Sequence, residues 1–333
     1  MIAGDVLRAW IGDPGARDET MTRVAAVGRA LRDLPALASL DADLARADAE
    51  SAESLLGCVR AWVETPGALD ACIAALVDGA RSDPFFRPPV RAVSTELHAG
   101  LVLLSRPDLS LFLATLPPDA LAAKRTFGRG PTSISFDGHR SLYHFVKSGG
   151  ATLSFWEVAD CDDDFSAAAA GTCRQVGTRQ ISDGETVELD GRRQSFVIEH
   201  ASSDMVYLQA QTTVGAAPLM REHDSATGRF VGASSTDDVA SRTGLMLSLL
   251  REMDRNDAAP LFVDALAQGG FHARWHAMRE FLALDAEAAL PHLRAMAEED
   301  PHPEVREAAR QTLDAIFAEE EISADGEPQP CPA

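Results

Sequence analysis

The stretch SLYHFVKSGGATLSFWEV, from Ser141 to Val158, decides the fold class. It contains two runs rich in β-branched and aromatic residues, Ser141–Lys147 and Thr152–Val158, on either side of Gly149-Gly150. Such runs favour strands, and a glycine pair between them is typical of a hairpin turn. The stretch therefore predicts two adjacent antiparallel strands.

The same pattern continues in both directions and predicts a β region over residues 107–234. Alternating leucines open it at Leu109, Leu111 and Leu113, and Asp-Gly turns divide the later runs. Further predicted strands are Ser133–Phe136, Gln175–Ile181, Thr186–Leu189, Ser195–His200 and Met205–Thr213, with Pro218–Glu222 and Arg229–Gly232 as two more candidates. Many short strands separated by turns indicate a sandwich, barrel or jelly roll.

Helical spacing predicts α-structure on both sides of the β region. Residues 1–106 are interpreted as a helical N-terminal region, with Ser51 as an N-cap and Val90–Leu104 as the last helix. Residues 235–320 are interpreted as a second helical region, and the proline-rich residues 321–333 as a disordered tail. The predicted fold class is α+β multidomain.

The segment DPHPEVREAA, from Asp300 to Ala309 and followed by Leu313, resembles the second half of a HEAT repeat. In that family an Asp-Pro turn joins two antiparallel helices, and proline is tolerated at a helix start. The resemblance covers about residues 257–318, where a weak internal period of 31 residues relates two segments. It implies HEAT-like α-hairpins, which commonly serve as scaffolds or partner-binding surfaces.

The segment SDGETVELDGRRQ, from Ser182 to Gln194, resembles the second motif of the cupin family, with Leu189 where the motif has proline. The resemblance implies a cupin-like antiparallel β-sandwich or jelly roll over residues 107–234. In the family this motif supplies a metal-binding His, and Gln194 occupies that place here.

The family's first motif has two His separated by one residue, which strand alternation places on one face. His139 and His144 are five residues apart, so we expect them on opposite faces and predict no metal cofactor. The alternative is an iron or other divalent metal centre with relocated ligands, namely His144, His200 and Glu157. Two imidazoles and a carboxylate leave coordination positions open for a substrate.

Candidate binding residues fall in both regions. In the β region we expect a metal-free cavity lined by Tyr143, Trp156, Gln194 and His200. In the C-terminal helices we expect partner binding through Arg274, Trp275, Arg279 and Arg306, because Trp and Arg are typical interface anchors. The alternative is that Trp275 packs inward and the arginines pair with local carboxylates.

Composition limits the partners. The formal net charge is -21, from 51 acidic and 30 basic residues, which disfavours nucleic acid and anionic membrane surfaces. Five cysteines, none spaced C-x-x-C, argue against a disulfide framework and a cysteine zinc site. With no signal peptide or transmembrane run visible, we expect a cytoplasmic protein.

These observations lead to two functional hypotheses. The first is a non-catalytic binding, scaffold or regulatory protein, with a small ligand in the β cavity and a protein or peptide on the helical surface. The alternative is a metal-dependent cupin-type enzyme, an oxygenase or isomerase with non-standard ligands.

Overall fold

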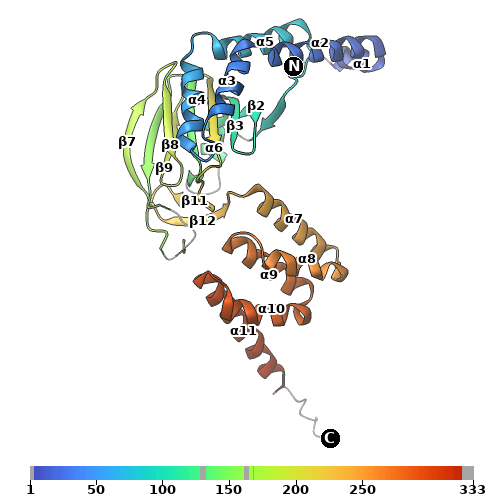
Figure 1. Ribbon diagram of the computed structural model, residues 1–333, viewed down its shortest axis with the longest axis vertical. Coiled ribbons are helices and arrows are strands. Elements are labelled where there is room, and N and C mark those ends of the chain that lie inside the picture. Colours follow the sequence, from blue (N-terminus) through green and yellow to red (C-terminus); the bar gives the residue numbers. More distant parts are fainter. Residues whose placement is uncertain (1–3, 96, 128–132, 161–164, 168, 325–333) are drawn as a thin grey trace. The chain divides into compact units, whose positions relative to one another are not determined.

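The computed structural model describes residues 4–95, 97–127, 133–160, 165–167 and 169–324 (Figure 1). The chain divides into two compact units. The first comprises residues 1–160, 172–216 and 222–231, and the second comprises residues 161–171, 217–221 and 232–333. The division passes through two strands, β11 (Leu219–Asp224) and β12 (Phe230–Ser235).

Helices form the first part of the chain, as the apolar spacing predicts. They are α1 (Gly4–Gly12), α2 (Pro14–Arg32), α3 (Pro35–Arg46), α4 (Ala52–Glu64) and α5 (Ala68–Ser82). The predicted N-cap is confirmed, because the Ser51 side chain accepts a hydrogen bond from the Ser54 amide at 3.2 Å. Proline at the first turn of α2 and α3 suits a helix start, where the missing amide hydrogen has no partner to lose.

A hydrogen-bonded chain joins α1, α2 and the end of α5. The Trp10 indole donates to the Thr20 hydroxyl at 3.1 Å, and that hydroxyl donates to the Asp83 carboxylate at 2.7 Å. The Trp10 ring also stacks on Phe85, with centroids 4.6 Å apart. The hydrogen bond from Thr20 is the main reason that the pKa of Asp83 lies below its usual range.

The largest sheet has six strands in the order β1-β2-β3-β10-β5-β8, all antiparallel. Its strands are β1 (Arg91–Ser94), β2 (Ala99–Ser105), β3 (Leu109–Leu116), β5 (Arg140–Lys147), β8 (Thr186–Asp190) and β10 (Met205–Thr212). The predicted helix over Val90–Leu104 is therefore wrong. Residues 100–104 of β2 are all buried or half-buried, and a bulge interrupts the strand between Val102 and Leu104, so the run lacks the alternation that marks a half-exposed strand.

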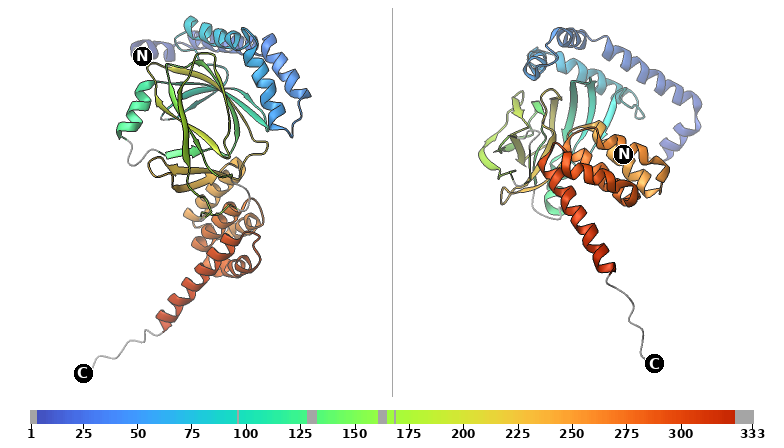
Figure 2. Two further views of the ribbon diagram at one scale, coloured as in Figure 1. Left: turned by 90° about the vertical axis from the view of Figure 1, so that its left-hand side faces the viewer. Right: turned by 60° about the horizontal axis from the view of Figure 1, so that its bottom comes forward.

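A second sheet faces the first, in the order β7-β6-β9 (Figure 2). It consists of β6 (Thr152–Glu157), β7 (Arg174–Gln180) and β9 (Gln194–His200). A third sheet has the order β12-β11-β4, with β4 at Ser133–Phe136. The predicted strands of the β region are confirmed to within a few residues, and this antiparallel layering fits a jelly roll. Helix α6 (Pro118–Phe127) follows β3.

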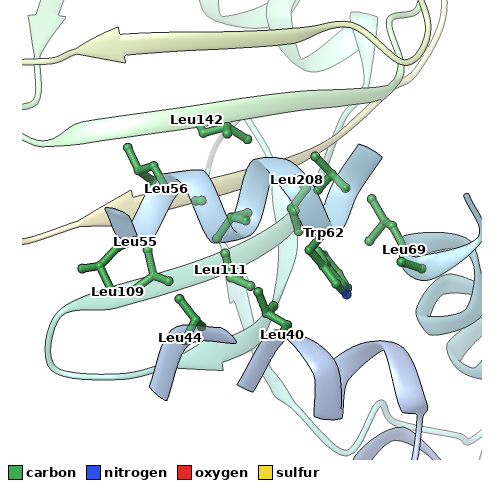
Figure 3. Packing of buried hydrophobic residues seen from close by; sticks show 14 of the residues in the cluster. Leu40, Leu44, Leu55, Leu56, Trp62, Leu69, Leu109, Leu111, Leu142 and Leu208 are labelled. Atoms are coloured by element: carbon green, nitrogen blue, oxygen red, sulfur yellow. The ribbon is translucent and has the colours of Figure 1, made fainter. Parts of the chain in front are cut away.

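Helices α3, α4 and α5 cover the outer face of the large sheet. Leu111, Leu142 and Leu208, from three adjacent strands, are fully buried against them (Figure 3). The helices supply Leu40, Leu44, Leu55, Leu56, Trp62 and Leu69 to the same cluster. An ion pair also joins α4 to β8 on this face, because the Arg60 guanidinium contacts the Glu188 carboxylate at two points, 2.5 and 2.6 Å.

Helices return after β12: α7 (Asp238–Glu252), α8 (Ala259–Leu266), α9 (Phe271–Leu284), α10 (Ala286–Glu299) and α11 (Pro303–Ala324). Phe262, Phe281 and Ala289 form one buried cluster, and Met278, Leu293 and Val305 belong to the next. Since α11 extends through Ala324, residues 321–324 of the predicted disordered tail are helical, and residues 325–333 lie outside the described part of the chain.

The expectations for the cysteines and for membrane-spanning helices can be compared with the described residues. Cys58, Cys72 and Cys173 are free thiols, whereas Cys161 and Cys331 lie outside the described ranges. Burial raises the pKa of the Cys72 and Cys173 thiols, so neither is activated as a thiolate. Within the same described ranges, no helix is long and apolar enough to cross a membrane.

Truncating Leu208 tests the importance of the covered sheet face. Leu208→Ala removes a fully buried side chain from the central strand β10 and should lower the free energy of unfolding by about 2–5 kcal/mol. Urea denaturation measures the difference. Val231→Ala, at a side chain that is 63% exposed, is the matched control and should change stability by less than about 0.5 kcal/mol.

Candidate functional site

Strand alternation divides the side chains of β5 between two environments. Leu142 and Val146 pack under the helices, whereas Tyr143 and Phe145 point between the two sheets. The paired strand β10 does the same, with Leu208 under the helices and Tyr207 between the sheets. The interior of the jelly roll is thus lined with aromatic side chains, including Phe155 and Phe196 from the second sheet.

One hydrogen bond between side chains lies within this interior. Gln209 is opposite Tyr143 in the β10–β5 register, and its amide donates to the Tyr143 hydroxyl at 3.1 Å. The Tyr143 ring meets the Phe196 ring edge-on, with centroids 4.9 Å apart. Tyr207 lies next to it at 6.1 Å. A polar pair is therefore held in a fixed orientation between aromatic walls.

The same end of the interior carries two more polar groups. Ser141 is 1% exposed, and its hydroxyl interacts with the Tyr143 hydroxyl. Asp137 precedes β5, and its carboxylate accepts from the His139 amide at 3.0 Å. Burial raises the pKa of Asp137 above its usual range, although that hydrogen bond opposes the rise.

Both tyrosines of the chain titrate abnormally because of this burial. Burial raises the pKa of Tyr143 well above 10, and the nearby Asp137 carboxylate adds to the effect. Burial also raises the pKa of Tyr207 to about 12. At neutral pH the two hydroxyls and the Gln209 amide are uncharged, and the Asp137 carboxylate is the ionisable group beside them.

The other three predicted cavity residues each have their own contacts. Trp156 packs against a separate cluster that contains Ile134 and Phe136, and its indole donates to the Ser154 hydroxyl at 3.1 Å. Gln194 accepts from the Asp190 amide in the β8–β9 turn at 3.2 Å. His200 is exposed at the end of β9, where its ring contacts Ser202. Gln194 shares a face of β9 with Phe196, whose ring contacts Tyr143, whereas Trp156 and His200 have other neighbours.

The three alternative metal ligands do not fit one metal ion. His144 lies on the helix-covered face, where its Nδ1 is 3.0 Å from the Thr186 hydroxyl and burial lowers its pKa. In the other sheet, His200 pairs with Thr152 at the first residue of β6 and Glu157 is the last, a separation of roughly 16 Å. Glu157 also contacts Arg174 at 2.9 Å. No group of three or more His, Cys, Asp or Glu that suits a metal occurs among the described residues.

Three of the four predicted partner-binding residues have contacts within the C-terminal helices. The Arg274 guanidinium makes two 2.8 Å contacts with the Asp300 carboxylate, which is almost fully buried. Arg306 donates to the Asp300 carbonyl oxygen at 2.6 Å, and Trp275 packs beside Met278. Arg279 is exposed. Burial alone would raise the pKa of Asp300, but hydrogen bonds from Arg274 and the His302 amide lower it.

Sequence reasoning missed Gln209, Asp137 and Ser141. Gln209 continues the alternation of Met205 and Tyr207, so the pattern alone indicates that it faces inward. Its partner is not readable from the sequence, because Tyr143 lies 66 residues away and the two strands are not consecutive. Ser141 and Asp137 can be recognised as neighbours of this hydrogen bond only after the pairing of β5 with β10 is known.

A separate hollow of about 400 Å³ lies between α3, α4 and α5. Its lining includes Trp62, Pro35 and Asp43. The Trp62 indole already donates to the Ala36 carbonyl oxygen at 2.9 Å, and Asp43 contacts Arg46 at 2.5 Å. The polar groups of this hollow are therefore largely engaged within the helices.

Comparison with known proteins gives solved cupin-type structures. No family model matches the chain, and no curated protein matches it in sequence. DMSP lyase DddQ from Ruegeria pomeroyi is 13% identical over 55% of this chain and 91% of its own, with a TM-score of 0.29. A cupin domain from Bordetella pertussis is 10% identical over 36% and 98%, with a TM-score of 0.22.

Ectoine synthase from P. lautus is 15% identical over 36% of this chain and 67% of its own, with a TM-score of 0.22. All three are solved structures to which part of this chain is similar, with TM-scores below 0.5. The strand order and register given above, rather than these scores, carry the description of the β region.

The two tyrosines provide a spectroscopic test of the site. Their hydroxyls should stay protonated at pH 10.5 in the folded protein, since burial raises both pKa values, and should ionise there once the protein is denatured. Because the unfolded chain loses these protons first, stability should fall as the pH rises above about 10. Tyrosinate absorbance measures the ionisation. A normal titration of either hydroxyl in the folded protein would contradict its placement.

Substitutions at Arg274 and Arg279 distinguish an arginine that stabilises the fold from one that is available to a partner. Arg274→Ala leaves the buried Asp300 carboxylate without its cation and should destabilise the fold by about 3–5 kcal/mol. Arg279→Ala, on the exposed side of the same helix, should change stability by less than about 0.5 kcal/mol. Urea denaturation of both variants distinguishes them. Equal stability would show that the Asp300 contact is dispensable.

Proposed function

We propose that this chain is a non-catalytic binding protein that holds a small uncharged ligand between its two sheets without a metal ion. The observation that carries the proposal is the hydrogen bond between Gln209 and Tyr143 within an aromatic interior. Ligand sites commonly combine apolar walls with a few oriented polar groups.

The chemistry of the interior supports an uncharged ligand. The Tyr143 hydroxyl still has a proton to donate, and the Gln209 amide retains its carbonyl oxygen as an acceptor. The buried Ser141 hydroxyl, beside that of Tyr143, extends this polar group. Neutral groups of this kind suit a ligand hydroxyl or amide, and the rings of Phe196 and Tyr207 suit a flat or apolar portion.

A metal-dependent oxygenase or isomerase remains the alternative function. Its candidate ligands His144, His200 and Glu157 lie on different faces or at opposite ends of strands, which favours the metal-free proposal. The scaffold part of the proposal rests on the C-terminal helices, where two successive helix pairs, α8–α9 and α10–α11, fit the HEAT-like resemblance. We propose that they bind a protein or peptide, with Arg279 among the exposed contacts.

Metal analysis separates the two functions. Untagged protein, before and after incubation with Fe(II), Mn(II), Ni(II) or Zn(II), should hold well below one equivalent of metal by plasma mass spectrometry. His144→Ala and His200→Ala should leave that value unchanged. One equivalent of metal that is lost in either variant would establish the enzyme hypothesis instead.

Ligand-observed NMR tests the site itself, with monosaccharides, polyols and nicotinamide as probes. At least one of these uncharged compounds should bind, and Tyr143→Phe should weaken that binding by about three- to tenfold through the loss of one hydrogen bond. Gln175→Ala, on the exposed strand β7, is the control and should bind like the wild type. Failure of all the probes, or equal binding by both variants, would contradict the proposal.

A further inference from the structure

Helix α7 has a strip of apolar side chains on its exposed face. Val239, Leu245, Met246, Leu249 and Met253 are between 51% and 71% exposed. On the opposite face, Leu247 is 4% exposed and packs with Phe262 and Phe281. One face of α7 therefore packs against its own unit. The other face is exposed to solvent, although it is more apolar than solvent-exposed surfaces usually are.

The strip is continuous because of its spacing. Met246, Leu249 and Met253 follow one another at three and four residues, and Val239 lies seven residues before Met246. Side chains at these intervals lie on one side of a helix. The charged residues Asp238, Arg242 and Glu252 lie on or beside the same strip, since they are spaced from Leu249 and Leu245 by three or seven residues.

We propose that this strip, on α7 between Asp238 and Met253, is a homodimer interface in which two α7 helices pack antiparallel about a twofold axis that crosses the helix at the level of Leu247. This surface is separate from the site between the sheets, so the proposal does not depend on the ligand. A twofold interface uses the same patch on both copies, and the patch must therefore be complementary to itself.

The charges on the strip meet that requirement only in the antiparallel arrangement. Arg242 and Glu252 lie five residues on either side of Leu247, or about 7.5 Å along the helix axis. Antiparallel packing therefore places Arg242 of one copy opposite Glu252 of the other. Parallel packing in register would place like charges together.

The apolar residues follow the same symmetry. The twofold axis brings Leu245 of one copy opposite Leu249 of the other, since each lies two residues from Leu247. Met246 lies near the axis, where its flexible side chain adapts to its own copy. Antiparallel helices that share an apolar seam pack in this way, with side chains of one helix between those of the other.

The charged groups are available for this exchange. Arg242 is 76% exposed and lies 3.6 Å from Asp238, a weak surface pair. Glu252 is 67% exposed and contacts Arg251, which also binds Glu280. The net charge of -21 per copy opposes association in general, but that repulsion is screened beyond about 8 Å at physiological salt.

Sedimentation equilibrium of the full chain at physiological salt tests the interface. The wild type should be a dimer, and Met246→Glu or Leu249→Glu should raise the dissociation constant at least about tenfold. Val176→Glu, at an exposed apolar residue of β7, is the matched control and should not alter association. Circular dichroism should show the same fold in every variant, because all three positions are exposed.

Charge reversal tests the antiparallel geometry specifically. Arg242→Glu and Glu252→Arg should each weaken the dimer, and the double variant should restore the wild-type dissociation constant to within a few fold. A monomeric wild type, a dimer indifferent to the strip variants, or a double variant weaker than both single ones would overturn the proposal. Thermal destabilisation of a monomeric wild type by Met246→Glu would overturn it too, because the strip would then be covered within the chain.

Discussion

The burial of one face of the six-stranded sheet under α3, α4 and α5 is the constraint on which the first unit depends. Leucines from three adjacent strands and three helices form a single cluster there, with Leu111, Leu142 and Leu208 fully buried. Because side chains alternate along a strand, covering one face determines what the other face holds. A shift of one residue in β5 or β10 would bury the polar groups of the interior under the helices.

That constraint places Tyr143 and Gln209 between the sheets. Their neighbours on the same strands, Leu142 and Leu208, belong to the helix-covered cluster, so the two polar residues have only the interior available. Burial of both hydroxyl-bearing rings follows from the same geometry and accounts for their raised pKa values. The polar end of the jelly roll is thus a consequence of the helices on its outside.

The sequence predicted most strands, because Gly and Asp turns mark their ends and β-branched residues fill them. It failed over Val90–Leu104, where a bulge at Val102 and the half-buried residues around it remove the alternation of a strand, and the apolar spacing resembles that of a helix. Alternation does not apply to His139, because this residue precedes β5 and is not in a strand. It did not identify Gln209 as the partner of Tyr143, because pairing between distant strands depends on the whole sheet.

Arg274 illustrates a different limit. Trp and Arg at helical spacing on α9 are typical of an interface, yet the Asp-Pro turn 26 residues later supplies the carboxylate that Arg274 contacts. Composition and periodicity describe one helix at a time and do not reveal which loop returns to it. Arg279, one turn further along, has no such loop beside it and stays exposed.

The helix-covered face also has a consequence for synthesis on the ribosome. Helices α3, α4 and α5 emerge first, but the strands that they cover include β5 and β10, which end at residues 147 and 212. Their apolar sides therefore stay open to water, or to a chaperone, while more than a hundred further residues are translated. A ribosome that stalls before Met205 would hold a nascent chain whose helices are made and whose sheet lacks its central strand.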